Sequence, residues 1–326
     1  MFYRKRRGEN FYYVNNQNKI IKNTDIIDRI NKLIIPPAWK DVQISNNVND
    51  DVQVTGIDSK GRLQYIYSQK YKKQQEKLKY KRITEFGKYI NDIRRDINKR
   101  LRKDELTKKK LVAIIIYLID LTHLRIGNDQ YTDSYGLTTL LDKHIKFTKC
   151  TVRFEFIGKK GVLNRAILYD KFIIKQLHQI KDEIKPKKNE KFFQYKNEDG
   201  AKKIIHSTDI NDFLKYYSKM NLTAKDFRTW SANNLFIEYI IELEKPKNIT
   251  NIRKNIVDTV KHVSNKLNNT PIICKKDYCC KYIIESYIED VDTFLRIIRK
   301  YCSSPMKYNT GIESAVIYFL NKNKLN

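Results

Sequence analysis

Two arginines, a lysine and a tyrosine lie in this 326-residue sequence where they could together cleave a phosphodiester. Cleavage without a metal requires a nucleophile, cations that stabilise a pentacoordinate phosphorus, and a proton donor for the leaving oxygen. Arg125 directly follows the apolar segment 110–121, and Arg228 lies in a helical pattern that continues apolar to Leu243. A guanidinium group in either place could bind phosphate through two hydrogen bonds.

The cations also have ordinary explanations. Arg125 could stabilise the C-terminal dipole of a helix. Arg228 could form a salt bridge with Asp226 or Glu238. Lys159 lies at the tip of a predicted hairpin, in "GKKG", where exposed lysines are common. Each signal is weak alone, so the chemistry depends on their combination.

Tyr278 is the candidate nucleophile because a helical wheel places it away from the predicted core. At 100° per residue, the helix expected over 270–288 turns one narrow stripe inward: Ile273, Cys280, Ile284 and Tyr287. Tyr278 falls almost opposite this stripe, near Lys275. Because tyrosine usually offers its ring to a core or an interface, this placement needs another reason.

The elements that must position these side chains change in kind along the sequence. Residues 10–68 predict short strands and one helix at 24–34, which "IPPAW" ends. The cation-rich stretch 69–82 predicts a linker or an exposed helix. Beyond it, a strand-turn-strand hairpin is expected over 150–169. Helices are expected at 83–102, 104–122, 170–182, 207–219, 225–243, 249–267, 270–288 and 311–323.

Composition points to a polyanionic partner. Lysine and arginine number 65 against 37 acids, a formal charge of +28, so nucleic acid is the first candidate and an anionic membrane the second. The longest apolar run, 111–121, is about half of the roughly 20 residues that a spanning helix needs. The polar N-terminus predicts no signal peptide, so an intracellular location is expected.

The five cysteines predict free thiols and no metal site. They are Cys150, Cys274, Cys279, Cys280 and Cys302. No C-x-x-C pair is present, and the nearby His262 does not complete a zinc ligand set. The sequence also has no acidic metal cluster, no glycine-rich phosphate loop and no nucleophile elbow.

Five motifs in order make the sequence resemble the type IB DNA topoisomerases of the small poxvirus and bacterial kind. They are "TGIDSKGRLQYIY" (55–67), "LRIGNDQY" (124–131), "EFIGKKG" (155–161), "KDFRTW" (225–230) and "NNTPIICKKDY" (268–278), and "IPPAWKDV" (35–42) adds to them. The resemblance covers nearly the whole chain. The abundance of lysine, asparagine, isoleucine and tyrosine suits an A/T-rich genome, such as that of an insect poxvirus or another large DNA virus.

The resemblance implies a role for each candidate. Tyr278 matches the family's nucleophile, and Arg125 and Arg228 match the arginines that contact non-bridging phosphate oxygens. Lys159 matches the general acid for the 5′ oxygen, since the family lysine directly follows the turn glycine; Lys160 is its rival. Asn269 occupies a position that is histidine in poxviruses of vertebrates. Asparagine can donate a hydrogen bond but cannot carry charge, and it could also be a helix N-cap.

Further residues match the family's DNA contacts. Those of the groove-reading segment are Lys60, Gln64, Tyr65 and Tyr67, with Tyr131 as another groove contact. Because side chains alternate along a strand, at least one set within 63–67 should share a face. Lys225 and Asn233 are candidate contacts to the DNA backbone, and an ordinary solvated helix face explains them about equally well.

The resulting prediction is an α+β protein with a small β-rich DNA-binding domain, 1–78, and a mainly helical catalytic domain, 79–326. The two would clamp duplex DNA as a monomer. Transient cleavage of one strand through a 3′-phosphotyrosyl link would relax supercoils without ATP, metal or another cofactor. If the protein is viral, it is expected in virions and at cytoplasmic replication sites, and otherwise in the cytoplasm or nucleus.

Two alternatives stay open at this point. A tyrosine recombinase shares the arginine, lysine and tyrosine set but usually has a helical domain where 10–68 predicts strands. A non-catalytic protein that binds duplex DNA would explain the charge, although not the presence of every catalytic side chain.

Overall fold

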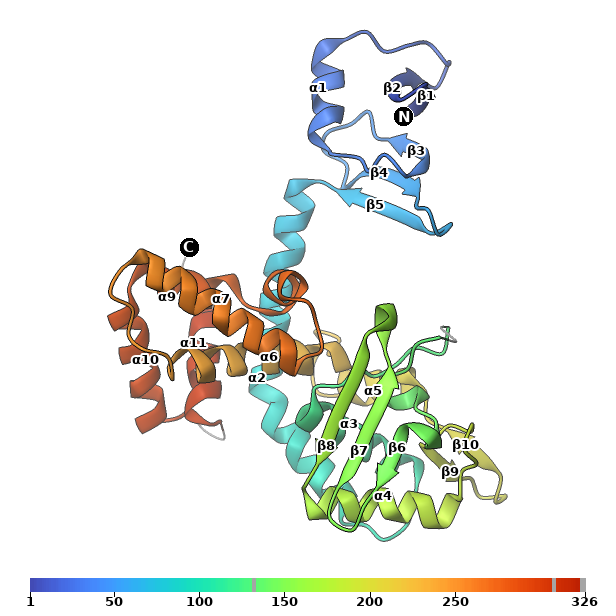
Figure 1. Cartoon of the computed structure of the whole chain (residues 1–326), viewed down its shortest axis with the longest axis vertical. Helices are drawn as coiled ribbons and strands as arrows, with labels where there is room; N and C mark the ends of the chain where they lie inside the picture. Colours follow the sequence, from blue (N-terminus) through green and yellow to red (C-terminus); the bar gives the residue numbers. More distant parts are fainter. Residues whose placement is uncertain (131–132, 307–308, 323–326) are drawn as a thin grey trace. The chain divides into compact units, whose positions relative to one another are not determined.

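The computed structural model describes residues 1–130, 133–306 and 309–322 (Figure 1). The chain divides into two compact units, Met1–Lys79 and Tyr80–Asn326. The first unit is built on a β-sheet, and the second is mainly helical with small antiparallel sheets. The predicted α+β class is therefore confirmed, whereas the functional roles assigned to domains 1–78 and 79–326 remain predictions.

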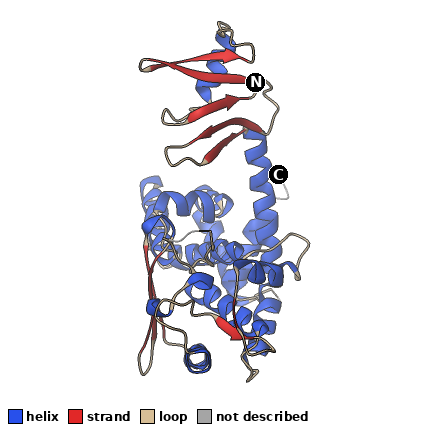
Figure 2. Ribbon diagram, turned by 90° about the vertical axis from the view of Figure 1, so that its right-hand side faces the viewer, coloured by secondary structure: helices blue, strands red, loops and turns tan. Residues whose placement is uncertain are grey.

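The first unit is a five-stranded antiparallel sheet with helix α1 (Thr24–Lys32), followed by the start of α2 (Gln69–Leu101) (Figure 2). Its strands are β1 (Phe2–Arg7), β2 (Asn10–Asn15), β3 (Lys40–Ile44), β4 (Val52–Ile57) and β5 (Leu63–Tyr67), in the order β2-β1-β3-β4-β5. Helix α1 begins after Asn23, whose side chain accepts a hydrogen bond from the Ile26 amide. A core of Ile30 on α1 with Val42, Ile44 and Val54 on the sheet joins the two layers.

The second unit contains most of the helices. They are α2 (Gln69–Leu101, which begins in the first unit), α3 (Lys108–Thr122), α4 (Lys171–Ile184), α5 (Ser207–Lys215), α6 (Ala224–Ile240), α7 (Ile249–Lys266), α8 (Pro271–Ile273), α9 (Lys281–Glu289), α10 (Val291–Ser303) and α11 (Gly311–Lys322). Short strands β9 (Gln194–Lys196) and β10 (Lys202–Ile204) form a two-stranded sheet. None of the helices that the structure describes is long and apolar enough to cross a membrane.

Helices α3 and α6 form the centre of the second unit. The segment from Leu111 to Ile116 on α3 is fully buried, as expected for a helix that is apolar on all sides. On α6, Phe227 and Trp230 pack their rings against Phe86 of α2. Arg228 lies near the start of α6, and Arg125 lies on the loop that follows α3, so a packed core supports both candidate residues.

The predicted hairpin over 150–169 is confirmed as part of a three-stranded antiparallel sheet. Its strands are β6 (Ile145–Phe147), β7 (Val152–Ile157) and β8 (Leu163–Leu168), in the order β6-β7-β8 (Figure 1). Along β7, Val152, Phe154 and Phe156 are buried and the residues between them are exposed. At the tip, the Gly158 amide donates to the Val162 carbonyl over 2.8 Å, which closes the turn that bears the lysines.

Several expectations about the elements were wrong. The continuous helix expected over 270–288 is broken, because Cys279 and Cys280 have extended backbone between α8 and α9. By contrast, the lysine-rich stretch 69–82 is the largely exposed first part of α2, so the exposed helix, one of the two alternatives predicted for it, is confirmed. Strands β1, β6, β9 and β10 and helix α10 were not expected; the short strands depend on pairing with neighbours that local patterns do not reveal.

Candidate active site

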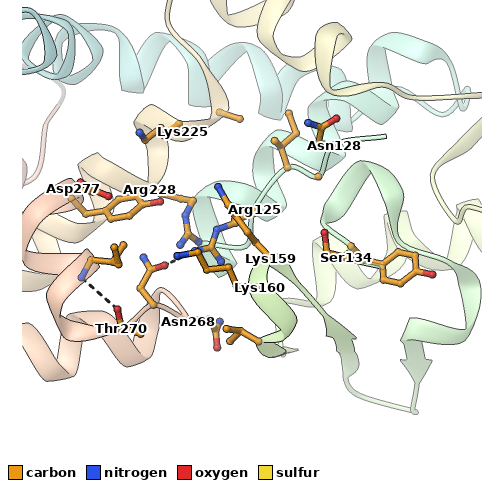
Figure 3. Close-up of a pocket in the computed structure, with 18 residues that line it drawn as sticks. Arg125, Asn128, Ser134, Lys159, Lys160, Lys225, Arg228, Asn268, Thr270 and Asp277 are labelled. Carbon is orange, nitrogen blue, oxygen red and sulfur yellow. Dashed lines mark hydrogen bonds between the residues drawn. The ribbon is translucent and has the colours of Figure 1, made fainter. Parts of the chain in front are cut away.

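A cavity of about 510 Å³ in the second unit brings together all five predicted catalytic residues (Figure 3). It is lined by Arg125, Lys159, Arg228, Asn269 and Tyr278, together with Lys225. These residues come from five separate segments of the chain. The close-up shows Arg125, Arg228, Lys159 and Lys160 extending into the same space, so the cavity is strongly cationic.

Arg125 lies on a loop that neighbouring backbone holds in place. Helix α3 ends at His123, whose φ of 57° lies in the left-handed region. The carbonyl of Arg125 then accepts a hydrogen bond from the Leu137 amide over 2.9 Å. A Cβ on Gly136 would lie only 2.4 Å from the Gly127 nitrogen, so only glycine permits the two chain segments to approach this closely.

Arg228 is a buried cation held by the ends of two helices. Its guanidinium donates to the carbonyl of His123, after α3, and over 2.7 Å to that of Leu267, after α7. Carbonyls at helix C-termini lack helical partners and carry the negative end of the dipole, so they suit a cation. Burial, followed by the charge of Arg125, lowers the pKa of Arg228 to about 10, which leaves it protonated at neutral pH.

The salt bridge considered for Arg228 is not formed. Asp226 instead pairs with Arg82 at 2.9 Å and accepts from the backbone of Thr223. The guanidinium of Arg228 therefore has no carboxylate partner among the described residues. Its Nε is buried and has no hydrogen-bond partner in that part of the chain.

Asn269 uses one end of its amide and leaves the other available. Its Oδ1 accepts a hydrogen bond from the guanidinium of Arg125. Its Nδ2 is buried and finds no partner within the residues that the structure describes. The suggested N-cap role was wrong, because the cap of α8 is Thr270, whose hydroxyl accepts from the Ile273 amide.

Tyr278 is buried, contrary to the helical-wheel argument. Residues 274–278 form one π-helical turn, in which the Cys279 amide donates to the Cys274 carbonyl over 3.0 Å. Tyr278 is only 8% exposed, and its ring centroid lies 5.4 Å from Cζ of Arg228. The tyrosine reaches the cavity because the turn is wider than an α-helical one, not because it occupies the outer face of a long helix.

The surroundings of Tyr278 favour its ionised form. Burial by itself raises the pKa of a phenol, but the charge of Arg228 and then those of Arg125 and Lys225 act in the opposite direction. The net effect lowers the pKa of Tyr278 below its usual value. A phenolate is the nucleophilic form of tyrosine, so this arrangement activates the side chain.

Asn233 is placed differently from its predicted role as a DNA contact. It is 2% exposed, and its Nδ2 donates to the Thr229 carbonyl over 2.7 Å and to the Tyr278 carbonyl over 3.2 Å. Its Oδ1 accepts from the Cys280 amide over 2.7 Å. Asn233 therefore positions the backbone on both sides of Cys279 and cannot touch DNA from this position.

The hairpin lysines both line the cavity. Lys159 and Lys160 are exposed in the turn between β7 and β8. Lys160 has a φ of 64°, a left-handed conformation that is unfavourable for a side chain with a Cβ. Lys225, at the start of α6, is exposed and also lines the cavity.

The predicted groove contacts of the first unit lie on edge strand β5 and the turn before it. Tyr65 and Tyr67 stack with centroids 6.0 Å apart, so they share one face. Gln64 points to the other face, where its Nε2 donates to Asp58 over 3.0 Å. Lys60 is exposed in the turn. Tyr131 lies outside the described residues.

Sequence reasoning missed the groups that hold the candidate catalytic residues. The carbonyls of His123 and Leu267 bind Arg228, but every residue has a carbonyl and no pattern singles these out. The cavity is also lined by Asn128, Ser134, Asn268 and Asp277, none of which was singled out from the sequence as a site residue. Among the described residues, no group of three or more His, Cys, Asp and Glu side chains could hold a metal ion.

A buried tyrosine with a lowered pKa among cationic side chains is the arrangement expected of a protein whose own side chain attacks a phosphodiester. Residues 68–301 match the family model for the eukaryotic DNA topoisomerase I catalytic core, and residues 10–58 match that for the bacterial DNA topoisomerase IB N-terminal domain. The DNA topoisomerase 1B of Acanthamoeba polyphaga mimivirus is 32% identical over 92% of this chain and 94% of its own.

Other similar proteins are also named DNA topoisomerases. The DNA topoisomerase 1B of Vaccinia virus (strain Copenhagen) is 26% identical, over 75% of this chain and 74% of its own. The DNA topoisomerase 1 of Schizosaccharomyces pombe is 29% identical over 65% of this chain but only 24% of its own length. The chain belongs to the type IB DNA topoisomerases, in the viral and bacterial-like group. It is an isomerase that acts on DNA, and the recombinase and non-catalytic alternatives are not favoured.

Proposed function

We propose that the enzyme relaxes supercoiled DNA by joining Tyr278 to a 3′-phosphate in one strand and then reversing this step. The observation that carries the proposal is the convergence of unused donors around a phenol with a lowered pKa. Nε of Arg228 and Nδ2 of Asn269 are buried without partners among the described residues. Buried donors normally find an acceptor, and non-bridging phosphate oxygens would supply one.

In the first step, the phenolate oxygen of Tyr278 attacks the phosphorus and the 5′ oxygen leaves. Negative charge grows on the non-bridging oxygens as the pentacoordinate state forms. Arg125 and Arg228 are charged donors, and Asn269 is a neutral one, so all three would bind these oxygens most strongly in the transition state. The bonds from Arg228 to two helix ends hold it in position before DNA arrives.

The departing 5′ oxygen needs a proton. We assign this role to Lys159, which lines the cavity from the hairpin tip. Its neighbour Lys160 lines the same cavity and would contribute positive charge. In the return step, the 5′-OH attacks the phosphotyrosine, Lys159 accepts the proton, and the strand is restored. Because one phosphodiester replaces another, bond energy is conserved and the cycle needs no ATP.

The proposal extends to the DNA contacts, the roles of the two domains, the oligomeric state and the place of action. We propose that Lys60, Tyr65 and Tyr67 of the first unit and Lys225 of the second contact duplex DNA, with domains 1–78 and 79–326 acting as the binding and catalytic parts. The enzyme would work as a monomer, since every predicted catalytic side chain comes from one chain. Viral relatives suggest a viral enzyme that acts inside infected cells.

One assay tests the proposed function. Purified protein is incubated with supercoiled plasmid in the presence of EDTA, beside the Tyr278→Phe variant. We expect the natural protein to relax the plasmid and to be trapped on DNA in a denaturing gel, and the variant to bind DNA without an adduct. Adduct formation by Tyr278→Phe would reject Tyr278 as the nucleophile, and recombined products would indicate the recombinase activity instead.

A further inference from the structure

Two buried thiols flank the turn that carries Tyr278. Cys274 begins the π-helical turn, Cys279 directly follows it, and their sulfur atoms are 3.9 Å apart. Their exposed fractions are 0% and 3%. In an α-helix, residues five apart point about 140° away from each other. The wider turn brings the two side chains to the same side.

We propose that Cys274 and Cys279 are a site of reversible oxidation, at which hydrogen peroxide, a two-electron oxidant, converts them into a disulfide. The sulfur atoms need to approach by about 2 Å to reach bonding distance. Two thiols already in contact require only local movement for this. The inference that oxidation controls catalysis rests on the proposed role of Tyr278.

The chemistry balances without any other reactant. The thiolate of Cys274 attacks the peroxide, which breaks the O–O bond and gives a sulfenic acid and, after protonation, water. The Cys279 thiol then attacks the sulfenic sulfur, loses its proton, forms the S–S bond and releases a second water. Each sulfur is oxidised by one electron overall, and the peroxide is reduced by two.

The environment supports attack by Cys274. Its hydrogen bond with Cys279 has the largest effect and lowers the pKa of Cys274; burial acts against this, and the charge of Arg228 lowers the pKa further. The net direction is below the usual value, which favours the thiolate that reacts with oxidants. Neither thiol lines the cavity, but their chain neighbours Ile273 and Tyr278 do, so a small oxidant would have to reach the thiols past these residues.

A disulfide here would act on the nucleophile. Tyr278 lies between the two cysteines in sequence, and Asn233 holds its carbonyl and the Cys280 amide on the far side. Drawing Cys279 toward Cys274 would therefore shift a backbone segment that is fixed just beyond it. A misplacement of about 1 Å can cost roughly 10²-fold in rate, so we expect adduct formation to slow by at least about tenfold.

Cys280 is the competing partner. It is buried, 1% exposed, and directly follows Cys279. The remaining cysteines, Cys150 and Cys302, are exposed and far away in sequence. A useful parent protein for the test is therefore Cys150→Ser/Cys302→Ser, in which only the three buried thiols remain.

The experiment treats the folded parent protein with hydrogen peroxide and measures intact mass and single-turnover adduct formation. We expect the loss of two hydrogen atoms, a disulfide between tryptic peptides 267–275 and 277–281, and slower adduct formation that dithiothreitol restores. Cys274→Ala and Cys279→Ala in the parent should resist both changes, whereas Cys280→Ala should behave like the parent. Thermal unfolding of each variant checks that it is folded, and Cys→Ser replaces Cys→Ala where it is not.

Three results would overturn the proposal. They are the absence of an intramolecular disulfide in the folded protein, an unchanged cleavage rate in fully oxidised protein, and a Cys280→Ala variant that hydrogen peroxide neither oxidises nor slows. A failure of the proposed function is seen separately. In that case Tyr278→Phe would still form an adduct, while the mass change on oxidation would be unaffected.

Discussion

Asn269 allows the transition-state role of a single amide to be tested, because the structure gives its two ends different partners. Oδ1 accepts from Arg125, and the buried Nδ2 has no partner among the described residues. Asn269→Ala removes both functions. Asn269→Asp keeps an acceptor for Arg125 but removes the donor and adds negative charge beside the phosphate. Asn269→His keeps a donor.

The expected magnitudes follow from these contacts. Loss of one preorganised donor to a developing anion costs about 10²–10³ in rate. Loss of a hydrogen bond to a charged group costs about 1.5–3 kcal/mol, although effects within one network do not add. We therefore expect Asn269→Ala to cleave about 10²–10³-fold more slowly. Asn269→Asp should be at least as slow although Arg125 stays bound, and Asn269→His should retain substantial activity.

Single-turnover cleavage measures these effects directly. The substrate is a duplex, cut at a site first mapped on plasmid DNA, whose short 5′-OH strand dissociates so that religation cannot occur. Rates are taken across pH 5.5–8, because imidazole titrates near 6.5 and could add positive charge to Asn269→His at the acidic end. Thermal unfolding of Asn269→Ala should change little from capping, since Thr270 caps α8.

Two outcomes would contradict the proposed role of Asn269. If Asn269→Asp cleaves as fast as the natural protein, the residue acts only by holding Arg125. If Asn269→Ala is equally fast, neither contact matters for cleavage. Equal DNA binding by all variants, measured at one salt concentration in Tyr278→Phe protein, ensures that the comparison concerns the chemical step.

Four further outcomes are expected. Lys159→Ala should slow cleavage by about 10²–10⁴-fold, and sulfur in place of the 5′ oxygen should rescue it; rescue of Lys160→Ala instead would make Lys160 the acid. DNA binding should weaken with salt by about 0.9 in the log–log slope per neutralised phosphate, and a slope near zero would contradict binding through several phosphates. Burial, opposed by Asp120 and helped by Arg228, lowers the pKa of His123 to about 4. The imidazole is therefore neutral in the folded protein. Its contribution to the free energy of unfolding is complete above pH 6.5 and is lost as the pH falls toward about 4. Asparagine tolerates the left-handed backbone, so His123→Asn should make the free energy of unfolding depend less on pH in this range. Gly136→Ala should displace the Arg125 loop and reduce cleavage more than DNA binding, and an unchanged cleavage rate would show that the loop tolerates the added Cβ.

The sequence by itself determined the features that depend on local pattern. The apolar run of α3, the alternation along β7 and the turn glycines of "GKKG" each predict their element, because side-chain periodicity follows backbone periodicity. The candidate catalytic side chains could also be found in the sequence, but each signal was weak alone, and their roles came from the resemblance of the ordered motifs to a known family.

Only the tertiary structure decided how those side chains are held and which atoms remain available. The π-helical turn buries Tyr278, whereas a regular α-helix would have exposed it. Local sequence does not predict such a turn, because the packing around the segment decides whether it forms. Arg228 is held by carbonyls, and Asn233 holds the backbone carbonyl of Tyr278 instead of facing solvent as a DNA contact would. Residue type reports what a side chain can donate or accept, whereas its partner is set by which distant segments the fold brings within hydrogen-bonding distance.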